Sequence, residues 1–327
     1  MSSPKFPIKH RYTRRARFND YHSRKVYMIT IATEGRKAIF GNVAGDPNLT
    51  EEDENAPRMI LSPLGEHVRK CIADISLHHP GIKVVAQQVM PDHVHFIIFV
   101  TVEQTKHIGE IIRGFKIGCN KAYRESAQVS VSDESGYVNS KTGTLFEKGY
   151  NDRILMGKEQ LKRMVLYIND NPRRLLVKCN HPEYFSLKET SWKGMRIQAI
   201  GNVELLHKDI RIQVRCSRKS SEQEIKLQCD KVIDYVKMGA VIISPFISSG
   251  EKTIEKLVME LEGGIVRVEP NGFPPLYKPY GKLFTACAKG TLLLISCYPY
   301  SYEKIVLDRK RCEEMNNLAN MLSNTNL

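Results

Sequence analysis

The stretch VMPDHVHFIIFV, residues 89–100, decides how the first part of the chain folds. Two histidines separated by one apolar residue open a continuous apolar run, and Pro91-Asp92 just before them predicts a turn. Side chains alternate along a strand, so His93 and His95 are expected on the same face. The apolar run predicts a central strand, entered through a hairpin. Two imidazoles on a rigid strand are suited to holding a metal ion.

Two histidines can also alternate by chance on a half-buried face, so a second feature is needed. Residues 159–170 carry Leu161, Met164, Val165 and Ile168 at helical spacing, and the motif YINDNPRR follows from residue 167. Tyr167 and Asn171 are four residues apart, which places them on one face near the end of this expected helix.

A phenol and a side-chain amide brought to a two-histidine metal site would supply a nucleophile and a third ligand. A tyrosine hydroxyl is inert near its free pKa of about 10, so it needs an electrophile that a cation makes reactive. A phosphodiester fits this requirement. Attack of the phenol on phosphorus would release a free 3′-hydroxyl.

At these residues the chain resembles the single-tyrosine HUH transposases, and most closely the REP-associated tyrosine transposases. The resemblance covers roughly residues 1–190, in family order. It rests on the following segments: YMITIATEGRKAIFG near the start, VMPDHVHFI, RGFK at 113–116, GYNDRIL at 149–155 and the Tyr-Ile-x-x-Asn-Pro motif.

The resemblance implies that Tyr167 is the nucleophile and that His93, His95 and Asn171 bind Mg²⁺ or Mn²⁺. Related transposases carry glutamine four residues after the tyrosine, whereas this chain has the shorter asparagine. Asp152 stands where the family often has aspartate, and it is expected to accept a hydrogen bond from a metal-binding histidine. A plain surface aspartate is the alternative. Tyr150 is a rival nucleophile that lacks the amide four residues later.

The charge of the chain points to a polyanionic partner. The 327 residues carry a formal net charge of +13, and the sequence pI is about 9.3. Nucleic acid, as single strands or hairpins, is therefore the expected partner. The candidate phosphate contacts are Arg14 and Arg15 in the basic segment 5–25, Arg113 and Lys116 on an expected helix, and Arg153, Arg173 and Arg174 beside the proposed site. For the basic segment a solubilising arm is the alternative, and for the helix a merely solvated face.

The cysteines and the hydropathy restrict the setting of the protein. The eight cysteines form no C-x-x-C pair, so a zinc module is not expected. No apolar run is long enough to span a bilayer. A cytoplasmic, nucleoid-associated protein with reduced thiols is expected, with no membrane partner. A homodimer is left open, because the sequence does not decide whether the tyrosine serves its own subunit or a partner's.

The order of expected elements predicts an α+β fold of two domains. Residues 1–190 are expected to form a ferredoxin-like antiparallel sheet with helices on one face, the HUH endonuclease type. Residues 42–58, which contain the acidic run EEDEN, are expected to form a surface loop. Residues 191–227 are expected to connect, with short strands, to a Rossmann-like α/β accessory domain at 228–327.

The C-terminal region is similar to the Rossmann-type domain of the DNA-processing protein A family over about residues 228–320. The similarity rests on SSGEKT after a strand, the NGFPPLYKP loop and a late RKRC segment. SSGEKT lacks the first glycine and the spacing of a phosphate-binding loop. Ser248, Ser249 and Gly250 are expected either to cap a helix or to hold a phosphate on backbone N–H groups.

Three functions are compatible with these patterns. The first is a metal-dependent transposase or endonuclease that cleaves and rejoins single-stranded DNA through a 5′-phosphotyrosine, at hairpin or palindromic repeats. The second is a catalytically silent DNA-binding regulator of such repeats. The third is a zinc hydrolase built on the two histidines, for which the usual third ligand is missing.

Overall fold

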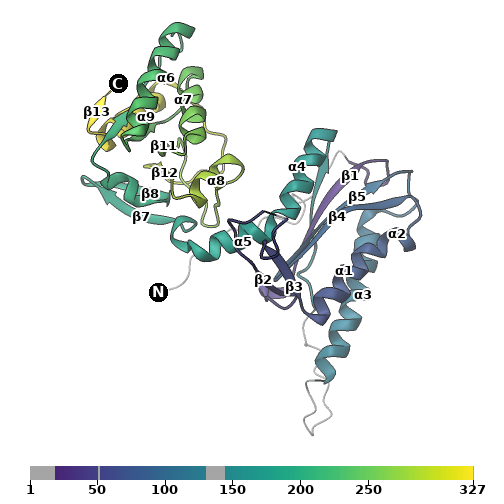
Figure 1. The fold of residues 1–327 in the computed structure, drawn as a ribbon. Helices are drawn as coiled ribbons and strands as arrows, with labels where there is room; N and C mark the ends of the chain where they lie inside the picture. Colours follow the sequence, from purple (N-terminus) through teal and green to yellow (C-terminus); the bar gives the residue numbers. More distant parts are fainter. Residues whose placement is uncertain (1–18, 51, 130–143, 327) are drawn as a thin grey trace. The chain divides into compact units, whose positions relative to one another are not determined.

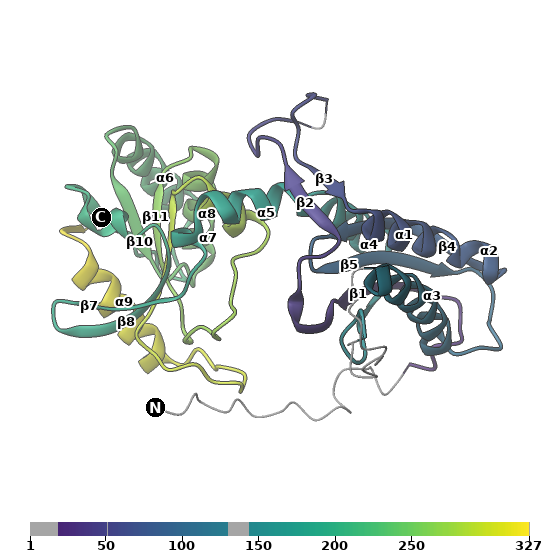
Figure 2. The same cartoon turned by 90° about the horizontal axis from the view of Figure 1, so that it is seen from below.

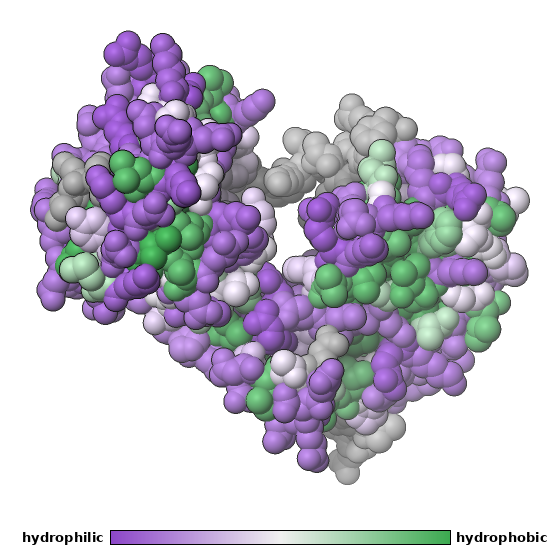
Figure 3. Space-filling view, turned by 45° about the horizontal axis from the view of Figure 1, so that its top comes forward, coloured by the Kyte–Doolittle hydropathy of each residue, from purple (hydrophilic) through white to green (hydrophobic). Residues whose placement is uncertain are grey.

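A computed structural model describes residues 19–50, 52–129 and 144–326. The chain divides into two compact units, unit 1 (Met1–Leu176) and unit 2 (Val177–Leu327). Figure 1 shows both units as mixtures of helices and strands, so the α+β class expected from the sequence is confirmed. Figure 3 shows hydrophilic residues over most of the visible face of each unit, with hydrophobic residues in smaller patches.

Unit 1 is built on a four-stranded sheet in the order β4-β5-β1-β6, and every neighbouring pair is antiparallel. The strands are β1 (Val26–Ala32), β4 (Ile82–Met90), β5 (His93–Val100) and β6 (Asn151–Leu155). The turn at Pro91 and Asp92 joins β4 to β5, as the sequence predicts. The histidine strand β5 lies inside the sheet, between β4 and β1.

Helices cover both faces of this sheet. One face carries α1 (Pro63–Ala73), α2 (Ile75–His78) and α3 (Ile108–Val129), whose apolar residues share one core with alternate residues of β1 and β5. The other face carries α4 (Lys158–Asn169), which packs on Met28, Ile97 and Leu155. The prediction of helices on one face only is wrong, because β1 and β5 are apolar on both sides and each side needs cover.

The expected surface loop at 42–58 is flanked by paired strands. β2 (Gly41–Ala44) and β3 (Arg58–Leu61) form an antiparallel hairpin, seen in Figure 2 beside the sheet of unit 1. A Cβ at Gly41 would lie 2.1 Å from the carbonyl oxygen of Ile60. The close approach of the two backbones therefore requires glycine at this position.

Unit 2 contains a seven-stranded sheet in the order β13-β9-β10-β11-β12-β8-β7. The first five strands in that order run parallel, and β8 and β7 are antiparallel to their neighbours. The strands are β7 (Lys188–Trp192), β8 (Met195–Gly201), β9 (Arg211–Gln213), β10 (Val241–Ser244), β11 (Gly264–Val268), β12 (Leu292–Ser296) and β13 (Thr325–Asn326).

Helices lie on both faces of this second sheet as well. Its helices are α6 (Glu222–Lys237), α7 (Ser249–Glu260), α8 (Lys282–Ala288) and α9 (Arg309–Leu322). The first three share one core, while α9 contributes to the other. The segment 191–227, which was expected to connect the two domains with short strands, supplies β8 and β9 to this sheet. These strands pair with β12 and β10. The boundary between the two units falls earlier in the chain, inside α5 (Asn171–Asn180).

Candidate active site

His93 and His95 project from the same face of β5, beneath α4. Within the sheet, His95 pairs with Thr30 and His93 with Ala32 of β1. Their Nε2 atoms are 3.1 Å apart, and the ring centroids are 4.7 Å apart. The strand period thus brings two imidazole nitrogens to one point, as expected from the His-x-His spacing.

Asp92 fixes the orientation of His93. Its Oδ1 lies 2.6 Å from Nδ1 of His93, and Arg36 lies 3.6 Å from the other carboxylate oxygen. Burial raises the pKa of Asp92, but the hydrogen bond to His93 and the positive charges of His93 and Arg36 outweigh burial and hold the pKa below its ordinary value. An ionised Asp92 accepts a hydrogen bond from Nδ1–H of His93, so in the neutral form of this imidazole the lone pair is on Nε2, the nitrogen that faces His95.

Thr30 holds His95 in a comparable way. The Thr30 hydroxyl lies 2.8 Å from Nδ1 of His95. His95 is only 7% exposed, and burial, together with the positive charges of His93 and Arg36, lowers its pKa to about 3. His95 is therefore neutral at ordinary pH, which is the form that binds metal ions. Thr30 was not among the residues predicted for the site, because only the pairing of β1 with β5 brings it to His95.

Tyr167 reaches the histidines from α4. The apolar stripe of α4 packs on the sheet, and Tyr167 stands beside that stripe with its ring centroid 6.0 Å from the ring of His95. It is 37% exposed, so a ligand in solvent can reach it. The guanidinium of Arg174 lies 5.4 Å from the centre of the tyrosine ring. The structure therefore brings Tyr167, His93 and His95 together within unit 1 of a single chain.

Asn171 opens a new helix instead of closing the helix that carries Tyr167. α4 ends at Asn169, Asp170 caps it, and α5 begins at Asn171. Pro172 has no N–H to continue the hydrogen-bond ladder, but proline is tolerated in the first turn of a helix. The expected placement on one helix is thus wrong. Asn171 is 8% exposed, and its Nδ2 is buried without a hydrogen-bond partner among the described residues.

The donor set at this point fits a divalent cation. Two Nε2 atoms 3.1 Å apart can both approach one ion at the usual distance of about 2.0–2.1 Å. Within 19–50, 52–129 and 144–326, no group of three His, Cys, Asp or Glu residues is arranged to hold a metal. The remaining ligands would have to be oxygens from a side-chain amide such as that of Asn171, from water or from a phosphate.

Asp152 does not support a histidine. It pairs with Ile29, whose side chain belongs to the core under α1 and α3, so strand alternation places Asp152 on the face opposite the histidines. Its Oδ2 accepts a hydrogen bond of 2.8 Å from the hydroxyl of Tyr21. The prediction that Asp152 stands behind a histidine is therefore wrong, and Asp92 occupies that role for His93.

The candidate phosphate contacts separate into several groups. Arg153 shares the histidine face and lies 4.0 Å from the Met164 sulfur of α4. Arg113 and Lys116 belong to α3, on the opposite face. Lys116 donates to the carbonyls of Glu147 and Gly149, and burial lowers its pKa to about 8. The position of α3 places both residues away from the histidines, because a sheet separates the two layers.

Arg173 and Arg174 lie at the junction of α4 and α5. Arg173 makes a two-point contact with Asp170, at 2.5 and 2.9 Å. Arg174 lies 4.0 Å from the same carboxylate. Arg14 and Arg15 are outside the described residues. The rival nucleophile Tyr150 is 9% exposed and belongs to the core under α3, where a DNA phosphate has no access.

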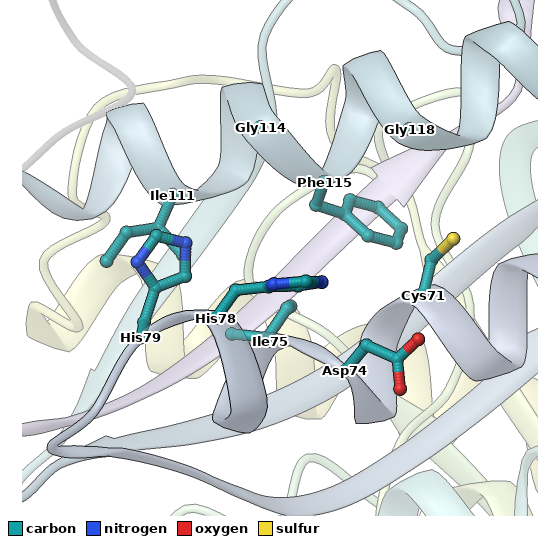
Figure 4. A pocket seen from close by; sticks show the side chains of 9 residues that line it. All are labelled: Cys71, Asp74, Ile75, His78, His79, Ile111, Gly114, Phe115 and Gly118. Atoms are coloured by element: carbon teal, nitrogen blue, oxygen red, sulfur yellow. The ribbon is translucent and has the colours of Figure 1, made fainter.

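A separate cavity of about 270 Å³ lies between α1, α2 and α3. Figure 4 shows His78 and His79 at its rim and Phe115 from α3 across from them. Because Phe115 belongs to the core opposite α4, this cavity is on the other side of the sheet from His95. Its histidines therefore take no part in the site under α4.

No protein-family model matches the chain. A protein from Haemophilus influenzae, described as uncharacterized, is 24% identical over 186 residues, which are 50% of this chain and 89% of that protein. A REP-associated tyrosine transposase bound to a REP hairpin has 13% identity and a TM-score of 0.31, covering 48% of this chain and 73% of that one. DNA processing protein A from Helicobacter pylori, solved for its single-stranded DNA binding mode, has 16% identity and a TM-score of 0.35, covering 43% and 67%.

These values describe a partial resemblance of fold. No helix among the described residues is long and apolar enough to cross a membrane.

Proposed function

We propose that this protein is a metal-dependent endonuclease or transposase that cleaves and rejoins single-stranded DNA through a 5′-phosphotyrosine at Tyr167. The observation that carries the proposal is the convergence under α4: two Nε2 atoms 3.1 Å apart, with the tyrosine ring 6.0 Å from the ring of His95. The four antiparallel strands, ordered β4-β5-β1-β6 with helical connections, are compatible with the ferredoxin-like plan of HUH endonucleases.

The residues have distinct parts in this reaction. The phenolic oxygen of Tyr167 forms a bond to phosphorus while the bond from phosphorus to the 3′ oxygen breaks. The phenol proton passes to water, and the leaving 3′ oxygen takes up a proton. His93, His95 and Asn171 would hold Mg²⁺ or Mn²⁺, which supplies Lewis-acid polarisation of a non-bridging phosphate oxygen. Arg174, beside the tyrosine ring, would orient the phosphate.

The phosphotyrosine conserves the energy of the broken phosphodiester. Attack by a 3′-hydroxyl on the same phosphorus reverses the step, rejoins the strand and restores the phenol. No nucleotide triphosphate is needed, because the number of phosphodiester-type bonds stays constant. Hairpin or palindromic repeats are the proposed substrates, because their folded ends present an unpaired strand at a defined place.

The decisive experiment measures covalent protein–DNA adducts. The full-length protein is incubated with end-labelled hairpin DNA and Mn²⁺, and the product is resolved on a denaturing gel. Wild type and Tyr150→Phe are expected to give a shifted band, whereas Tyr167→Phe is expected to give none and still bind the DNA. Equal adducts in Tyr167→Phe would remove this tyrosine from the reaction.

The same experiment separates the other two functions. A DNA-binding regulator predicts binding with no adduct from wild type at any metal concentration. A zinc hydrolase predicts tight Zn²⁺ binding and an activity that Tyr167→Phe leaves unchanged. The lack of a third His, Cys, Asp or Glu beside the histidine pair, among the residues described, disfavours zinc.

A further inference from the structure

The edge strand β6 presents an exposed strip on the histidine face of the sheet in unit 1. β6 is the last strand of that sheet, and its residues Asn151 and Arg153 are exposed. Asn151 pairs with Thr30 of β1, and Arg153 pairs with Met28. Directly paired residues of antiparallel strands project to the same face, and Met28 is buried under α4. The strip of Asn151 and Arg153 therefore lies on the same face as the histidine pair.

Arg153 is close to the candidate active site along this strip. Thr30 pairs with Asn151 on one side and with His95 on the other, so these three residues form one row across the sheet. Arg153 stands two residues further along β6, about 7 Å from that row. Its Nη1 is 4.0 Å from Sδ of Met164, which lies one helical turn before Tyr167 in α4. The side of α4 that carries the tyrosine is therefore next to Arg153.

Arg163 adds a second positive charge from the helix. It is exposed and stands four residues before Tyr167 in α4, so the two side chains are neighbours on one flank of the helix. Glu159, four residues before Arg163, is the acid on α4 that could neutralise it. Glu159 is instead paired with Lys162 at 3.2 Å, which leaves the charge of Arg163 uncompensated on the helix.

Arg153 and Arg163 differ in this respect from the arginines on the other side of Tyr167. Neither has a carboxylate partner among the residues that the structure describes. Arg173 and Arg174, in contrast, lie 2.5 and 4.0 Å from the carboxylate of Asp170. An unpaired guanidinium binds a DNA phosphate without first giving up an ion pair. The two unpaired arginines are therefore better suited to hold the DNA backbone.

We propose that Arg153 and Arg163 bind the DNA backbone immediately beside the phosphate that Tyr167 attacks, so that the substrate strand runs over the exposed strip of β6 along α4. The inference rests on the proposed function, because it assigns the path of the strand that is cleaved there. Both arginines are positioning residues and touch no reacting atom. The alternative, that the charge of Arg153 only keeps the edge strand from pairing with another sheet, predicts no effect on DNA binding.

The first test locates the bound phosphate without cleavage. Full-length protein with Tyr167→Phe, in buffer containing EDTA, is titrated with DNA hairpins whose unpaired tails carry one uncharged methylphosphonate, at each tail position in turn. The substitution next to the cleaved phosphate, which the wild-type adducts identify, should weaken binding by about ten-fold, the scale of one hydrogen bond to a charged group. When Arg153→Gln and Arg163→Gln are both added, the same methylphosphonate should have almost no further effect.

The second test measures how the affinity for the unmodified hairpin depends on salt. Each phosphate contact on a single strand contributes about 0.7 to the slope of the logarithm of affinity against the logarithm of salt concentration. Arg153→Gln and Arg163→Gln should each make this slope less steep by about that amount. Arg153→Lys keeps the charge and should keep the slope. A change that only weakened the packing of Arg153 on Met164 would not distinguish lysine from glutamine in this way.

A matched control comes from the opposite face of the sheet. Arg113 is an exposed arginine of α3, which packs on that face. Arg113→Gln makes the same change of charge in the same unit and should keep both the methylphosphonate effect and the salt slope. Thermal unfolding shows whether each variant is folded.

The outcomes separate this inference from the catalytic proposal. Wild-type adducts together with a methylphosphonate effect that the double replacement leaves unchanged would overturn the path over β6 and leave Tyr167 in place. The absence of any methylphosphonate effect beside the cleaved phosphate would also overturn it. A methylphosphonate effect that depends on Arg153 and Arg163, in a protein that forms no adducts, would support these DNA contacts and overturn the catalytic proposal.

Discussion

Asp92 fixes the orientation of one of the two histidines of the candidate site. It bonds Nδ1 of His93 at 2.6 Å and so directs Nε2 of that ring towards His95. Thr30 performs the matching task for His95 from the neighbouring strand. Such supporting groups fix the tautomer and orientation of a metal-binding imidazole.

Replacement of Asp92 by asparagine tests this support. Asp92→Asn keeps the size of the side chain but removes the charge that favours a proton on Nδ1. We expect Mn²⁺ affinity to fall by about 10–100-fold, measured by titration calorimetry on the full-length protein. Asp234→Asn, at an exposed position of α6, should bind Mn²⁺ like wild type. Unchanged Mn²⁺ affinity in Asp92→Asn would show that the Asp92 carboxylate is not needed to orient the His93 ring.

Glu269 should make unit 2 sensitive to pH. Burial raises the pKa of Glu269 above its ordinary value, more than attraction to Arg267 lowers it. The folded chain therefore holds this proton to higher pH than the unfolded chain, and stability falls as pH rises through 4.5 and beyond. In Glu269→Gln the free energy of unfolding of unit 2 should decrease less as the pH rises. The same pH dependence in Glu269→Gln and wild type would contradict this prediction.

The sequence predicted the histidine pair because its alternation is a local property of one strand. It did not predict Thr30, which meets His95 only through the pairing of β1 with β5. Asp152 was assigned to the wrong face, since a one-residue shift in strand register moves every side chain across the sheet. Local patterns thus set which residues share a strand face, and long-range pairing sets which strands meet.

At the scale of elements, α7 shows how a helix start can resemble an anion site and yet be complete by itself. Ser248 caps the helix, and the carboxylate of Glu251 accepts hydrogen bonds from the backbone N–H groups of Ile247, Ser248 and Cys216 at 2.7, 3.1 and 3.2 Å. Glu251 is 3% exposed. The cap expected from the sequence is present, and Glu251 occupies the place where a phosphate would have to sit.

Removal of this carboxylate should be costly. Glu251→Ala leaves three backbone N–H groups without their acceptor, so we expect a loss of about 3 kcal/mol or more in the free energy of unfolding. Ser221→Ala removes the comparable but exposed cap of α6 and should cost about 1 kcal/mol. Denaturant unfolding measures both. Equal losses would indicate that burial of the α7 cap adds nothing.

The elements themselves were predictable to different degrees. The strands of unit 2 were visible as short apolar runs separated by glycine and by helical periods. The short strands expected within 191–227 include β8 and β9, and the sequence did not show that they pair with strands from the C-terminal region, β12 and β10. The placement of α4 opposite α1 and α3 was missed because helical periodicity shows an apolar stripe but not which face of a sheet it covers.

For the whole molecule, the two units have separate hydrophobic cores. We therefore expect two unfolding transitions in calorimetry. Asp152→Ala removes the acceptor of the Tyr21 hydroxyl in unit 1 and should lower one transition, by about 1.5–3 kcal/mol. Glu251→Ala should lower only the other. Mn²⁺ should raise only the transition that Asp152→Ala lowers. A single transition shifted by both changes would show that the units unfold together.

The contact between Asp170 and Arg173 has a consequence for how the protein would respond to ionic strength. A guanidinium already neutralised by a carboxylate releases fewer counterions from a bound DNA strand than a bare one. Asp170→Asn should therefore make the logarithm of DNA affinity fall more steeply with the logarithm of salt concentration, by about 0.7 for each arginine set free on a single strand. Asp170 would thus lower the affinity for DNA and allow bound strands to be exchanged.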